Sequence, residues 1–239
     1  MDFKVIYEDN DVLVVDKPAG VVVFLESTRS TRPSLVGKTL IDYLLEQKPE
    51  LKSVGEATRH GIVHRLDKDT SGILLVAKNN ESLLFLQKQF KSREVEKKYM
   101  ALANGIVKEE EGRIETLIGR SPADPRKQKA FPRKSPAFAG KREAITEYKV
   151  LERFDRYSLL EVKPKTGRKH QIRCHLAYIH HPIAGDKMYG FKDSPVPKGL
   201  NRQFLHSSYL KIRLPNGSVK EFNSDLPEDL KKILNNFKI

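Results

Sequence analysis

The nine residues His64-Arg65-Leu66-Asp67-Lys68-Asp69-Thr70-Ser71-Gly72 lie between two short apolar segments, residues 62–63 and 73–76. Branched apolar runs that are bounded by polar residues and glycine favour β-strands. The nine residues are therefore predicted to form a loop between two strands, with Asp67 near its middle. Loops held by neighbouring strands are common places for catalytic side chains.

A carboxylate such as Asp67 can act as a nucleophile only when it is ionised and partly removed from water. That state requires a nearby cation. Arg65 and Lys68 are close in sequence, but an arginine from another element could hold the carboxylate in a fixed two-point contact. Asp69 is two residues away, and in a loop this spacing alone does not make the two carboxylates an acid–base pair.

The segment Lys165-Thr166-Gly167-Arg168-Lys169-His170-Gln171-Ile172-Arg173 supplies such an arginine. It is predicted to turn at Gly167 into a helix. The apolar stripe of this helix consists of Ile172, Leu176 and Ile179. Backbone N–H groups at the helix start, together with Thr166 and Arg168, would form an anion site for a phosphate. Arg173 could point inward and pair with a buried Asp; the alternative is an amphipathic helix with a solvated basic face.

A third segment, Arg93-Glu94-Val95-Glu96-Lys97-Lys98-Tyr99-Met100-Ala101, is predicted to be a strand in which Lys97 and Tyr99 share one face. A tyrosine there could pack on a ring and relay a proton. Tyrosines in strands more often pack in the core or against a neighbouring strand. Both interpretations stay open from the residues alone.

The predicted helices and strands form a mixed pattern that contains runs of consecutive strands, as in an α+β protein. Thr39 is placed to cap a helix that ends before Pro49, and Asn80 is placed to open a second helix. The Asn216-Gly217 pair predicts a hairpin, and Asp225 is expected to cap the last helix. The predicted strands outside the nonapeptide region cover residues 3–7, 12–15, 98–103, 113–118, 144–151, 157–162, 204–214 and 218–222.

Runs of consecutive strands favour antiparallel pairing. We therefore expect one α+β domain, residues 1–239, with a mixed, largely antiparallel central sheet and flanking helices. A chain of 239 residues is long enough to bury a full core. No internal repeat or low-complexity tract interrupts it.

The chain is strongly basic, with 44 Lys and Arg residues against 31 Asp and Glu and a formal net charge of +13. Such an excess points to a polyanionic partner. Residues 120–142 contain eight basic residues and one acidic residue. Their net charge, 8 − 1 = +7, is more than half of the +13 of the chain. Prolines and a glycine in this segment predict an extended basic arm suited to phosphate contacts. The alternative is a solvated loop that keeps a basic protein soluble.

Several classes of protein are disfavoured by composition. The apolar runs are far too short to span a bilayer, and the first residues enter a strand pattern without an export signal. We therefore expect a cytoplasmic protein with no membrane contact. The single cysteine, Cys174, cannot form an intramolecular disulfide or build a zinc site alone.

Four segments together resemble the motifs of the RluA family of pseudouridine synthases. Residues 61–78 contain the family's HRLD-x-x-TSG signature in full, and Lys17-Pro18-Ala19-Gly20 resembles its N-terminal motif. Lys97-Lys98-Tyr99 is similar to its tyrosine motif, and residues 166–173 are similar to its TGR-x-HQIR motif. The resemblance implies an α+β fold with an RNA-binding cleft, and isomerisation of uridine to pseudouridine without a cofactor or metal.

The resemblance also assigns roles to residues. It implies that Asp67, Tyr99 and Arg173 are catalytic, with Arg173 pairing with Asp67, and that Arg65 fills the place of a flipped uridine in the base stack. Asp67 could attack C1′, attack C6, or take the 2′ proton in a glycal route. The residues expected to contact RNA are Lys17, His64, Arg65, Lys97, Arg126, Lys127, Lys129, Thr166, Arg168, His170 and Gln171.

The chain departs from the family pattern in three ways. It opens on the catalytic strands without the S4 RNA-binding domain that many members carry, so the arm at 120–142 is expected to supply more of the grip. Lys169 stands where Thr is common, and Phe24 stands where many members have His. These differences concern the substrate, for which ribosomal RNA and tRNA both fit; we expect a monomer.

Two other classes of function compete with this interpretation. His60, His64, Asp67, Asp69, His170 and His175 could form a metal-dependent nuclease site, because these side chains are metal ligands. No metal-ligand helix of the HExxH kind appears in the sequence. The second alternative is a non-catalytic RNA-binding or ribosome-assembly protein that keeps the fold.

Overall fold

The computed structural model describes residues 3–25, 37–134 and 140–237. Contacts along the chain divide it into two compact units. The first unit consists of Met1–Glu96 and Ser207–Asp225, and the second consists of Lys97–His206 and Leu226–Ile239. The chain thus crosses three times between the units, and the single domain expected over residues 1–239 stays a prediction.

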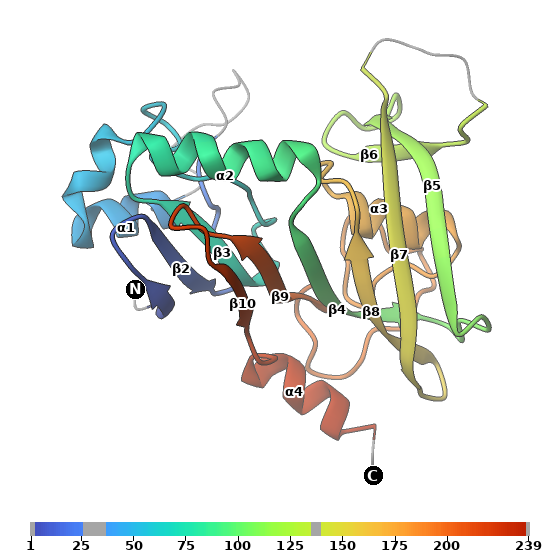
Figure 1. The fold of residues 1–239 in the computed structure, drawn as a ribbon. Helices are drawn as coiled ribbons and strands as arrows, with labels where there is room; N and C mark the ends of the chain where they lie inside the picture. The colour runs from blue at the N-terminus through green and yellow to red at the C-terminus, as the bar shows by residue number, and fades with distance from the viewer. Residues whose placement is uncertain (1–2, 26–36, 135–139, 238–239) are drawn as a thin grey trace. The chain divides into compact units, whose positions relative to one another are not determined.

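The first unit contains a sheet in the order β1-β2-β3-β9, with β10 paired to β9 (Figure 1). Its strands are β1 (Lys4–Glu8), β2 (Val12–Lys17), β3 (Ser71–Ala77), β9 (Leu205–Arg213) and β10 (Val219–Asn223). The pairs β1–β2, β2–β3 and β9–β10 are antiparallel. Every residue of β3 is buried, which explains its continuous apolar sequence.

The two α-helices of the first unit, α1 (Leu40–Gln47) and α2 (Asn80–Ser92), begin where the sequence predicts. A short 3-10 helix (Pro49–Ser53), which the sequence does not predict, follows α1. Thr39 caps α1: its hydroxyl accepts from the N–H of Asp42, and its own N–H donates to the Asp42 carboxylate. The helix α2 packs against β3, and its Gln89 side chain donates to the Arg213 carbonyl of β9.

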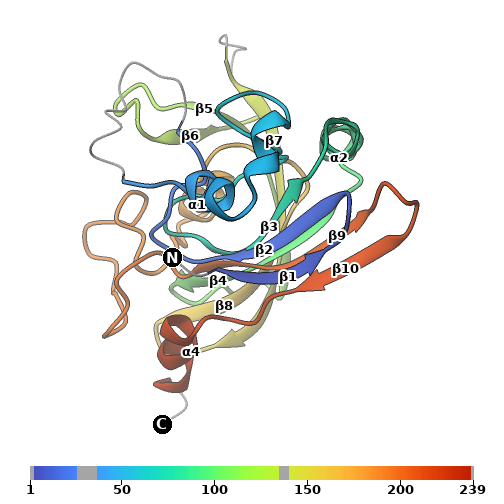
Figure 2. The same cartoon turned by 90° about the vertical axis from the view of Figure 1, so that its left-hand side faces the viewer.

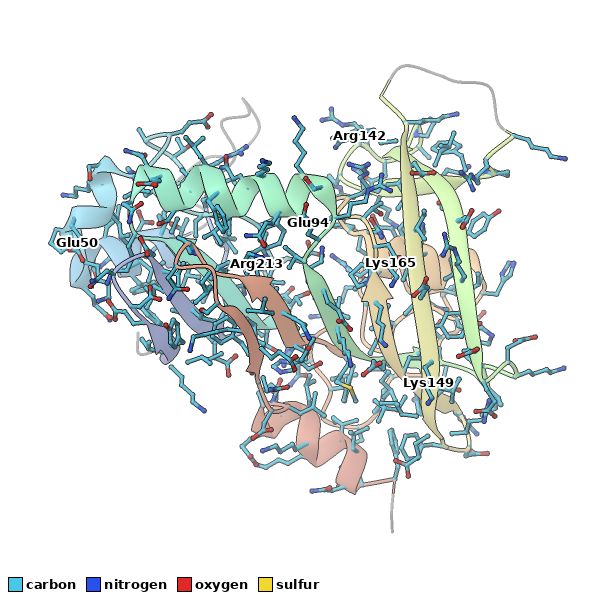
Figure 3. All side chains as sticks on the ribbon, viewed as in Figure 1. Glu50, Glu94, Arg142, Lys149, Lys165 and Arg213 are labelled. Atoms are coloured by element: carbon cyan, nitrogen blue, oxygen red, sulfur yellow. The ribbon has the colours of Figure 1, made fainter. Side chains whose placement is uncertain are left out.

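The second unit contains a sheet in the order β4-β8-β7-β5-β6 (Figure 1). Its strands are β4 (Glu96–Asn104), β5 (Glu111–Arg120), β6 (Gln128–Phe131), β7 (Arg142–Arg153) and β8 (Tyr157–Pro164). The pairs β4–β8, β7–β8, β5–β7 and β5–β6 are all antiparallel. Figure 3 labels two basic residues of β7, Arg142 at its start and Lys149 further along the strand, and both are exposed.

Two helices complete the second unit, and both begin later than the sequence predicts. The helix α3 (Gln171–Tyr178) packs against β6, β7 and β8. His170 adopts a left-handed conformation with φ of 55°, so the helix predicted from Gly167 starts only at Gln171. The helix α4 (Glu228–Asn235) follows Pro227, not Asp225, because the residue before a proline disfavours helical dihedrals.

The basic segment 120–142, predicted to be an extended arm or loop, contains one short strand and connections outside strands in its described part. Arg120 ends β5, residues 128–131 form β6 and Arg142 opens β7. Ala130 of β6 is buried with Ile118, Ala144, Cys174 and Tyr189, and this apolar contact draws the segment into the sheet. Residues 135–139 of the predicted arm lie outside the described part of the chain.

The α+β class and the largely antiparallel pairing are confirmed, whereas the RNA-binding cleft stays a prediction. Among the described residues, no helix has the length and apolar character needed to cross a membrane.

Candidate active site

The loop that carries Asp67 is held at its backbone. The N–H of Thr70 donates to the carbonyl of Asp67 at 3.1 Å, which closes a turn with Lys68 and Asp69 at its corner. The carbonyl of Lys68 accepts from the Nζ of Lys17 at 3.0 Å and from the N–H of Gly20 at 2.9 Å. The N-terminal motif therefore fixes the residue that follows Asp67, while the Asp67 side chain stays partly exposed.

Lys17 has no exposed surface, and its Nζ also donates to the carbonyl of Pro18 at 2.7 Å. It is the last residue of β2 and pairs with Gly72 of β3. Gly72 has a φ of +112°, and a Cβ at this position would overlap the backbone of Ser207 in β9. The RNA contact expected for Lys17 stays a prediction, and the burial of its side chain argues for a positioning role.

His64 is held to the scaffold through one ring nitrogen and one ring face. Its Nε2 accepts from the N–H of Leu75 at 3.1 Å, and its ring stacks on Phe90 of α2 with centroids 4.9 Å apart. An Nε2 that accepts a backbone N–H carries no proton, so the neutral ring holds its proton on Nδ1. His64 thereby joins the loop to β3 and α2.

Arg65 lies over an aromatic ring. Its guanidinium carbon is 5.0 Å from the centroid of Phe24, and that of Arg59 is 5.2 Å from the same centroid. Phe24 is buried, with 6% of its surface exposed. The ring thus supports two guanidinium groups, each within the distance at which cation–π attraction operates.

Tyr99 and Lys97 belong to β4 in the second unit. Tyr99 is 8% exposed and lies opposite Val162 of β8. Burial lowers the pKa of Lys97 from 10.5 to about 8, since removal from water disfavours the ammonium form. The two side chains share one face of the strand, as the alternation predicts.

Arg173 forms a two-point ion pair with a residue that the sequence does not single out. Its Nε and Nη2 donate to Oδ2 and Oδ1 of Asp186 at 2.7 and 2.8 Å. Burial raises the pKa of Asp186, but the hydrogen bonds and charge of Arg173, with the N–H groups of Tyr189 and Met188, outweigh it and hold the pKa below its ordinary value. The pairing of Arg173 with Asp67 stays a prediction.

Tyr189 lies beside this ion pair. Its ring centroid is 5.0 Å from the guanidinium carbon of Arg173. Its hydroxyl oxygen accepts from the N–H of Gln128 in β6 at 2.7 Å and lies 3.0 Å from Nδ1 of His170. One tyrosine therefore contacts β6, the start of α3 and the Arg173 side chain.

A buried polar network anchors α3 to the sheet. Gln171 donates from Nε2 to the carbonyl of Ile145 and to the hydroxyl of Thr146, and it accepts from the hydroxyl of Thr166 at 2.7 Å. These bonds give Thr166 and Gln171 a structural role that the sequence does not predict. Their contacts with RNA stay a prediction.

His175 continues this network. Its Nδ1 lies 2.8 Å from the hydroxyl of Thr146, and its Nε2 lies 2.9 Å from that of Thr116. The ring has no exposed surface, and burial lowers its pKa from 6.5 to about 4. His175 is therefore neutral at physiological pH and bridges α3 to two strands.

The anion site expected at the start of α3 is partly occupied by the chain itself. The N–H of Arg168 donates to Oε1 of Gln171 at 3.0 Å, and the Nε of Arg168 donates to the carbonyl of Glu143 at 2.9 Å. Lys169 is exposed, and His170 is partly exposed. The binding of a phosphate at this place stays a prediction.

The basic residues of the β5–β6 connection, taken here to include Lys129 of β6, are exposed or partly exposed. The side chain of Arg126 is 82% exposed and forms an ion pair with Asp124 at 2.8 Å. Hydrogen bonds from Arg126 lower the pKa of Asp124 to about 2. Lys129 is exposed, with its Nζ 5.6 Å from the centroid of Phe131, and Lys127 is partly exposed.

The predicted catalytic residues are distributed over both units: Asp67 belongs to the first, and Tyr99 and Arg173 belong to the second. Across the described ranges, no three His, Cys, Asp or Glu side chains gather as metal ligands would. Such a gathering is what the metal-dependent nuclease alternative requires. Burial raises the pKa of Cys174 to about 12, so its thiol is not a nucleophile at neutral pH.

A family model described as RNA pseudouridylate synthase matches residues 11–178 of the chain. The matched range contains Asp67, Tyr99 and Arg173. The chain belongs to this family. Membership of the pseudouridylate synthase family confirms the resemblance to RluA-type enzymes that the four motifs indicate.

Curated relatives match most of the chain. An uncharacterized RNA pseudouridine synthase of Aquifex aeolicus is 47% identical over 199 residues, which cover 82% of this chain and 59% of the relative. The ribosomal large subunit pseudouridine synthase D of Borreliella burgdorferi is 40% identical and covers 98% of this chain and 68% of its own length. An uncharacterized RNA pseudouridine synthase of Bacillus subtilis is 38% identical, and the match covers 100% of this chain and 74% of the relative. The chain thus spans 59% to 74% of these pseudouridine synthases.

Two solved structures share the fold. Human RNA pseudouridylate synthase domain containing 1 superposes with a TM-score of 0.75 at 29% identity and covers 97% of this chain and 87% of its own. Human RNA pseudouridylate synthase domain containing 4 gives a TM-score of 0.77 at 24% identity and covers 98% and 92%. The second likeness concerns the fold alone.

Sequence reasoning does not single out Asp186 and Tyr189, which contact Arg173, and it notes Phe24 only as a departure from the family pattern. Asp186 and Tyr189 lie 13 and 16 positions after Arg173, and Phe24 lies 41 before Arg65, so no local spacing connects them. The one signal available for Asp186 is its surroundings. An acidic residue that follows Ile183, Ala184 and Gly185 is a candidate for burial, and a buried carboxylate requires a cationic partner.

Proposed function

We propose that the chain converts uridines in structured RNA to pseudouridine, with ribosomal RNA as the first candidate substrate and tRNA as the second. The observation that carries the proposal is the family match over residues 11–178, which includes all three predicted catalytic residues. A relative named ribosomal large subunit pseudouridine synthase D, at 40% identity, supports ribosomal RNA. The net charge of +13 supports a polyanionic substrate.

In the proposed reaction the C1′–N1 bond of the uridine breaks, the uracil ring rotates, and a C1′–C5 bond forms with loss of the C5 proton to N1 or solvent. Substrate and product have the same atoms and oxidation level, so the reaction consumes no oxidant or reductant, and we propose that it uses no metal or cofactor. The uridine must first leave its base stack, at a cost of a few kcal/mol. The guanidinium of Arg65, which is planar, is suited to stack in the vacated place.

We assign to Asp67 the role of nucleophile or base, to Tyr99 contact with the uracil ring, and to Arg173 the stabilisation of the Asp67 carboxylate. A hydrogen-bonded turn that leaves the Asp67 side chain partly exposed supports the first assignment. A guanidinium held in one orientation by Asp186 supports the third. The protein is proposed to act in the cytoplasm as a monomer.

The test uses large-subunit ribosomal RNA and tRNA transcripts that carry tritium at C5 of uridine, because bond formation at C5 releases that tritium. We expect release from one transcript class with the wild-type protein and none with Asp67→Asn, while RNA binding persists. Asp69→Asn, in the same turn, is the matched control and should keep the rate within about threefold. Release by Asp67→Asn at the wild-type rate would exclude Asp67 as the reacting group.

The same assay separates the alternatives. A non-catalytic RNA-binding or ribosome-assembly protein would bind the transcripts and release no tritium in any variant. A metal-dependent nuclease would shorten the RNA and lose its activity in excess EDTA, whereas the proposed isomerisation should proceed unchanged.

A further inference from the structure

The guanidinium of Arg173 is fixed on one edge and one face within the second unit. Its Nε and Nη2 donate to the two carboxylate oxygens of Asp186 at 2.7 and 2.8 Å. The ring of Tyr189 lies 5.0 Å from its carbon. The side chains of Arg173 and Asp186 are 7% and 0% exposed, so water does not compete for these contacts.

Asp186 is itself held in place by the backbone around it. Its Oδ1 accepts from the N–H groups of Met188 and Tyr189 at 2.9 and 3.0 Å. Its carbonyl accepts from the N–H of Gly190 at 2.8 Å, where a Cβ would overlap that carbonyl oxygen. The turn from Asp186 to Gly190 therefore closes tightly around the carboxylate, which cannot follow a moving arginine.

Tyr189 is also held in place, through its hydroxyl group. Its hydroxyl accepts from the N–H of Gln128 in β6 and lies 3.0 Å from Nδ1 of His170, the residue before α3. The ring therefore cannot move without breaking contacts to β6 and to the start of α3. Arg173 thus lies between two supports that are each tied to the scaffold.

We propose that Asp186 and Tyr189 are positioning residues that hold the Arg173 guanidinium in its reactive orientation. This inference rests on the proposed function, in which Arg173 stabilises the Asp67 carboxylate. Because the guanidinium is planar and Asp186 binds the Nε and Nη2 edge, the orientation of Nη1 is set as well. A cation oriented before the substrate binds needs no reorganisation during the reaction.

A merely structural ion pair would stabilise the fold without changing the chemical step. The chain offers a matched control for that case: Arg202 donates from Nε and Nη2 to Asp229 at 2.7 and 3.1 Å, in the same two-point arrangement and in the same unit. Arg202 carries no assigned role in the reaction. Asp186→Asn and Asp229→Asn therefore each remove the carboxylate of a two-point pair; Asp186 is fully buried and has a proposed role in the reaction, whereas Asp229 is 54% exposed and has none.

The experiment measures the single-turnover rate of pseudouridine formation and, separately, the dissociation constant for RNA. We expect Asp186→Asn to slow the reaction about 10- to 100-fold, the range for a misplacement of about 1 Å, with RNA affinity within about threefold of wild type. Asp229→Asn should keep the wild-type rate. A folded Asp186→Asn protein with the wild-type rate, or equal rate losses in both variants, would overturn the proposal.

A second measurement uses the unaltered protein and covers the case in which Asp186→Asn does not fold. Arginine Nε–H signals are assigned through bonds by NMR, and their exchange with water is followed. The Nε–H of Arg173 should exchange far more slowly than those of exposed arginines such as Arg126. Equal exchange would show that no clamp exists. This result does not depend on activity, so a failure of the proposed function, seen as a wild-type protein that releases no tritium, is a separate outcome.

Discussion

The Nζ of Lys17 lies 3.0 Å from the carbonyl oxygen of Lys68, the residue that follows Asp67. Lys17 ends β2, and its aliphatic stem is fully buried. The ammonium group of Lys17 in β2 thus helps to place Asp67. It does so by binding the backbone of the loop and not a side chain of the loop. A positioning role of this kind predicts an effect on rate, and an RNA contact predicts an effect on affinity.

Lys17→Met should lower the single-turnover rate roughly tenfold or more, because the loop loses the donor that fixes Lys68. The dissociation constant for RNA should stay within about twofold. The control is Lys68→Met, which removes an exposed lysine from the same loop and leaves the carbonyl in place. If Lys17→Met instead weakens RNA binding and flattens its salt dependence with the rate unchanged, Lys17 contacts phosphate.

His175 predicts a pH dependence of stability. Its pKa is about 4 in the folded protein and 6.5 in the unfolded chain, so below pH 6.5 the unfolded chain takes up a proton that the folded protein does not. Stability should be constant with respect to this group above pH 6.5 and should fall by about 3 kcal/mol as the pH drops to 4, at about 1.4 kcal/mol per pKa unit. Urea unfolding between pH 4 and 8 measures it.

The variant His175→Gln should lose this part of the pH dependence. His180→Asn is the control, because His180 is exposed and its left-handed backbone, with φ of 66°, tolerates asparagine. The hydrogen bonds of His175 suit its neutral form. The Thr146 hydroxyl accepts from Gln171, so it can donate its own proton to Nδ1 of a neutral ring. An identical slope in wild type and His175→Gln would mean that another group titrates.

The parts of the fold that depend on neighbouring residues are well predicted by the sequence. Thr39 caps α1 with the expected hydrogen bonds, and the Asn216-Gly217 turn joins β9 to β10. These features follow from local backbone preferences, which act over a few residues. The start of α3 is missed because His170 takes a left-handed conformation that β-turn and helix rules do not anticipate for histidine.

The site is predicted less completely, for a physical reason. Asp67, Tyr99 and Arg173 are found through motifs, but their supports are partners in space. The Arg173–Asp186 pair and the Phe24–Arg65 contact join residues from different elements. A buried charge signals that a partner exists. It does not say which residue that partner is, since many acidic residues elsewhere in the sequence could supply it.

The basic β5–β6 connection predicts a change in salt dependence. Replacing Arg126, Lys127 and Lys129 by glutamine should weaken RNA binding and reduce the slope of log K against log salt by up to about 2 to 3, at 0.7 to 0.9 per phosphate contact. Asp124 already pairs with Arg126, so the two lysines should account for most of the change. Titrations by fluorescence anisotropy at several salt concentrations give the slope.

Lys231 and Lys232 of α4 provide a control for the loss of surface charge, with two positive charges removed where the test variant removes three. Both are exposed, and α4 lies at the opposite end of the second unit from β6 (Figures 1 and 2). Their replacement by glutamine should leave the slope unchanged. Equal slopes for the β5–β6 variant and wild type would remove this connection from the RNA interface.

The contact between Phe24 and Arg65 predicts that Phe24, a residue outside the catalytic motifs, affects the reaction through Arg65. Its ring lies under the guanidinium groups of Arg59 and Arg65, and each such contact contributes about 0.5 to 2 kcal/mol. Phe24→Leu keeps an apolar side chain but removes the aromatic face. We expect a loss of stability of about 1 to 2 kcal/mol and a several-fold lower rate on structured RNA, where Arg65 must take the place of the flipped uridine.

The sharper comparison is between substrates. If Phe24 acts by orienting Arg65, Phe24→Leu should slow the reaction on a uridine within a stem more than on a uridine in an unstructured oligonucleotide, because only the first leaves a gap in a stack. Phe24→His retains a flat ring under both guanidinium groups and should restore most of the difference. Equal slowing on both substrates would mean that Phe24 supports the fold and not the stacking of Arg65.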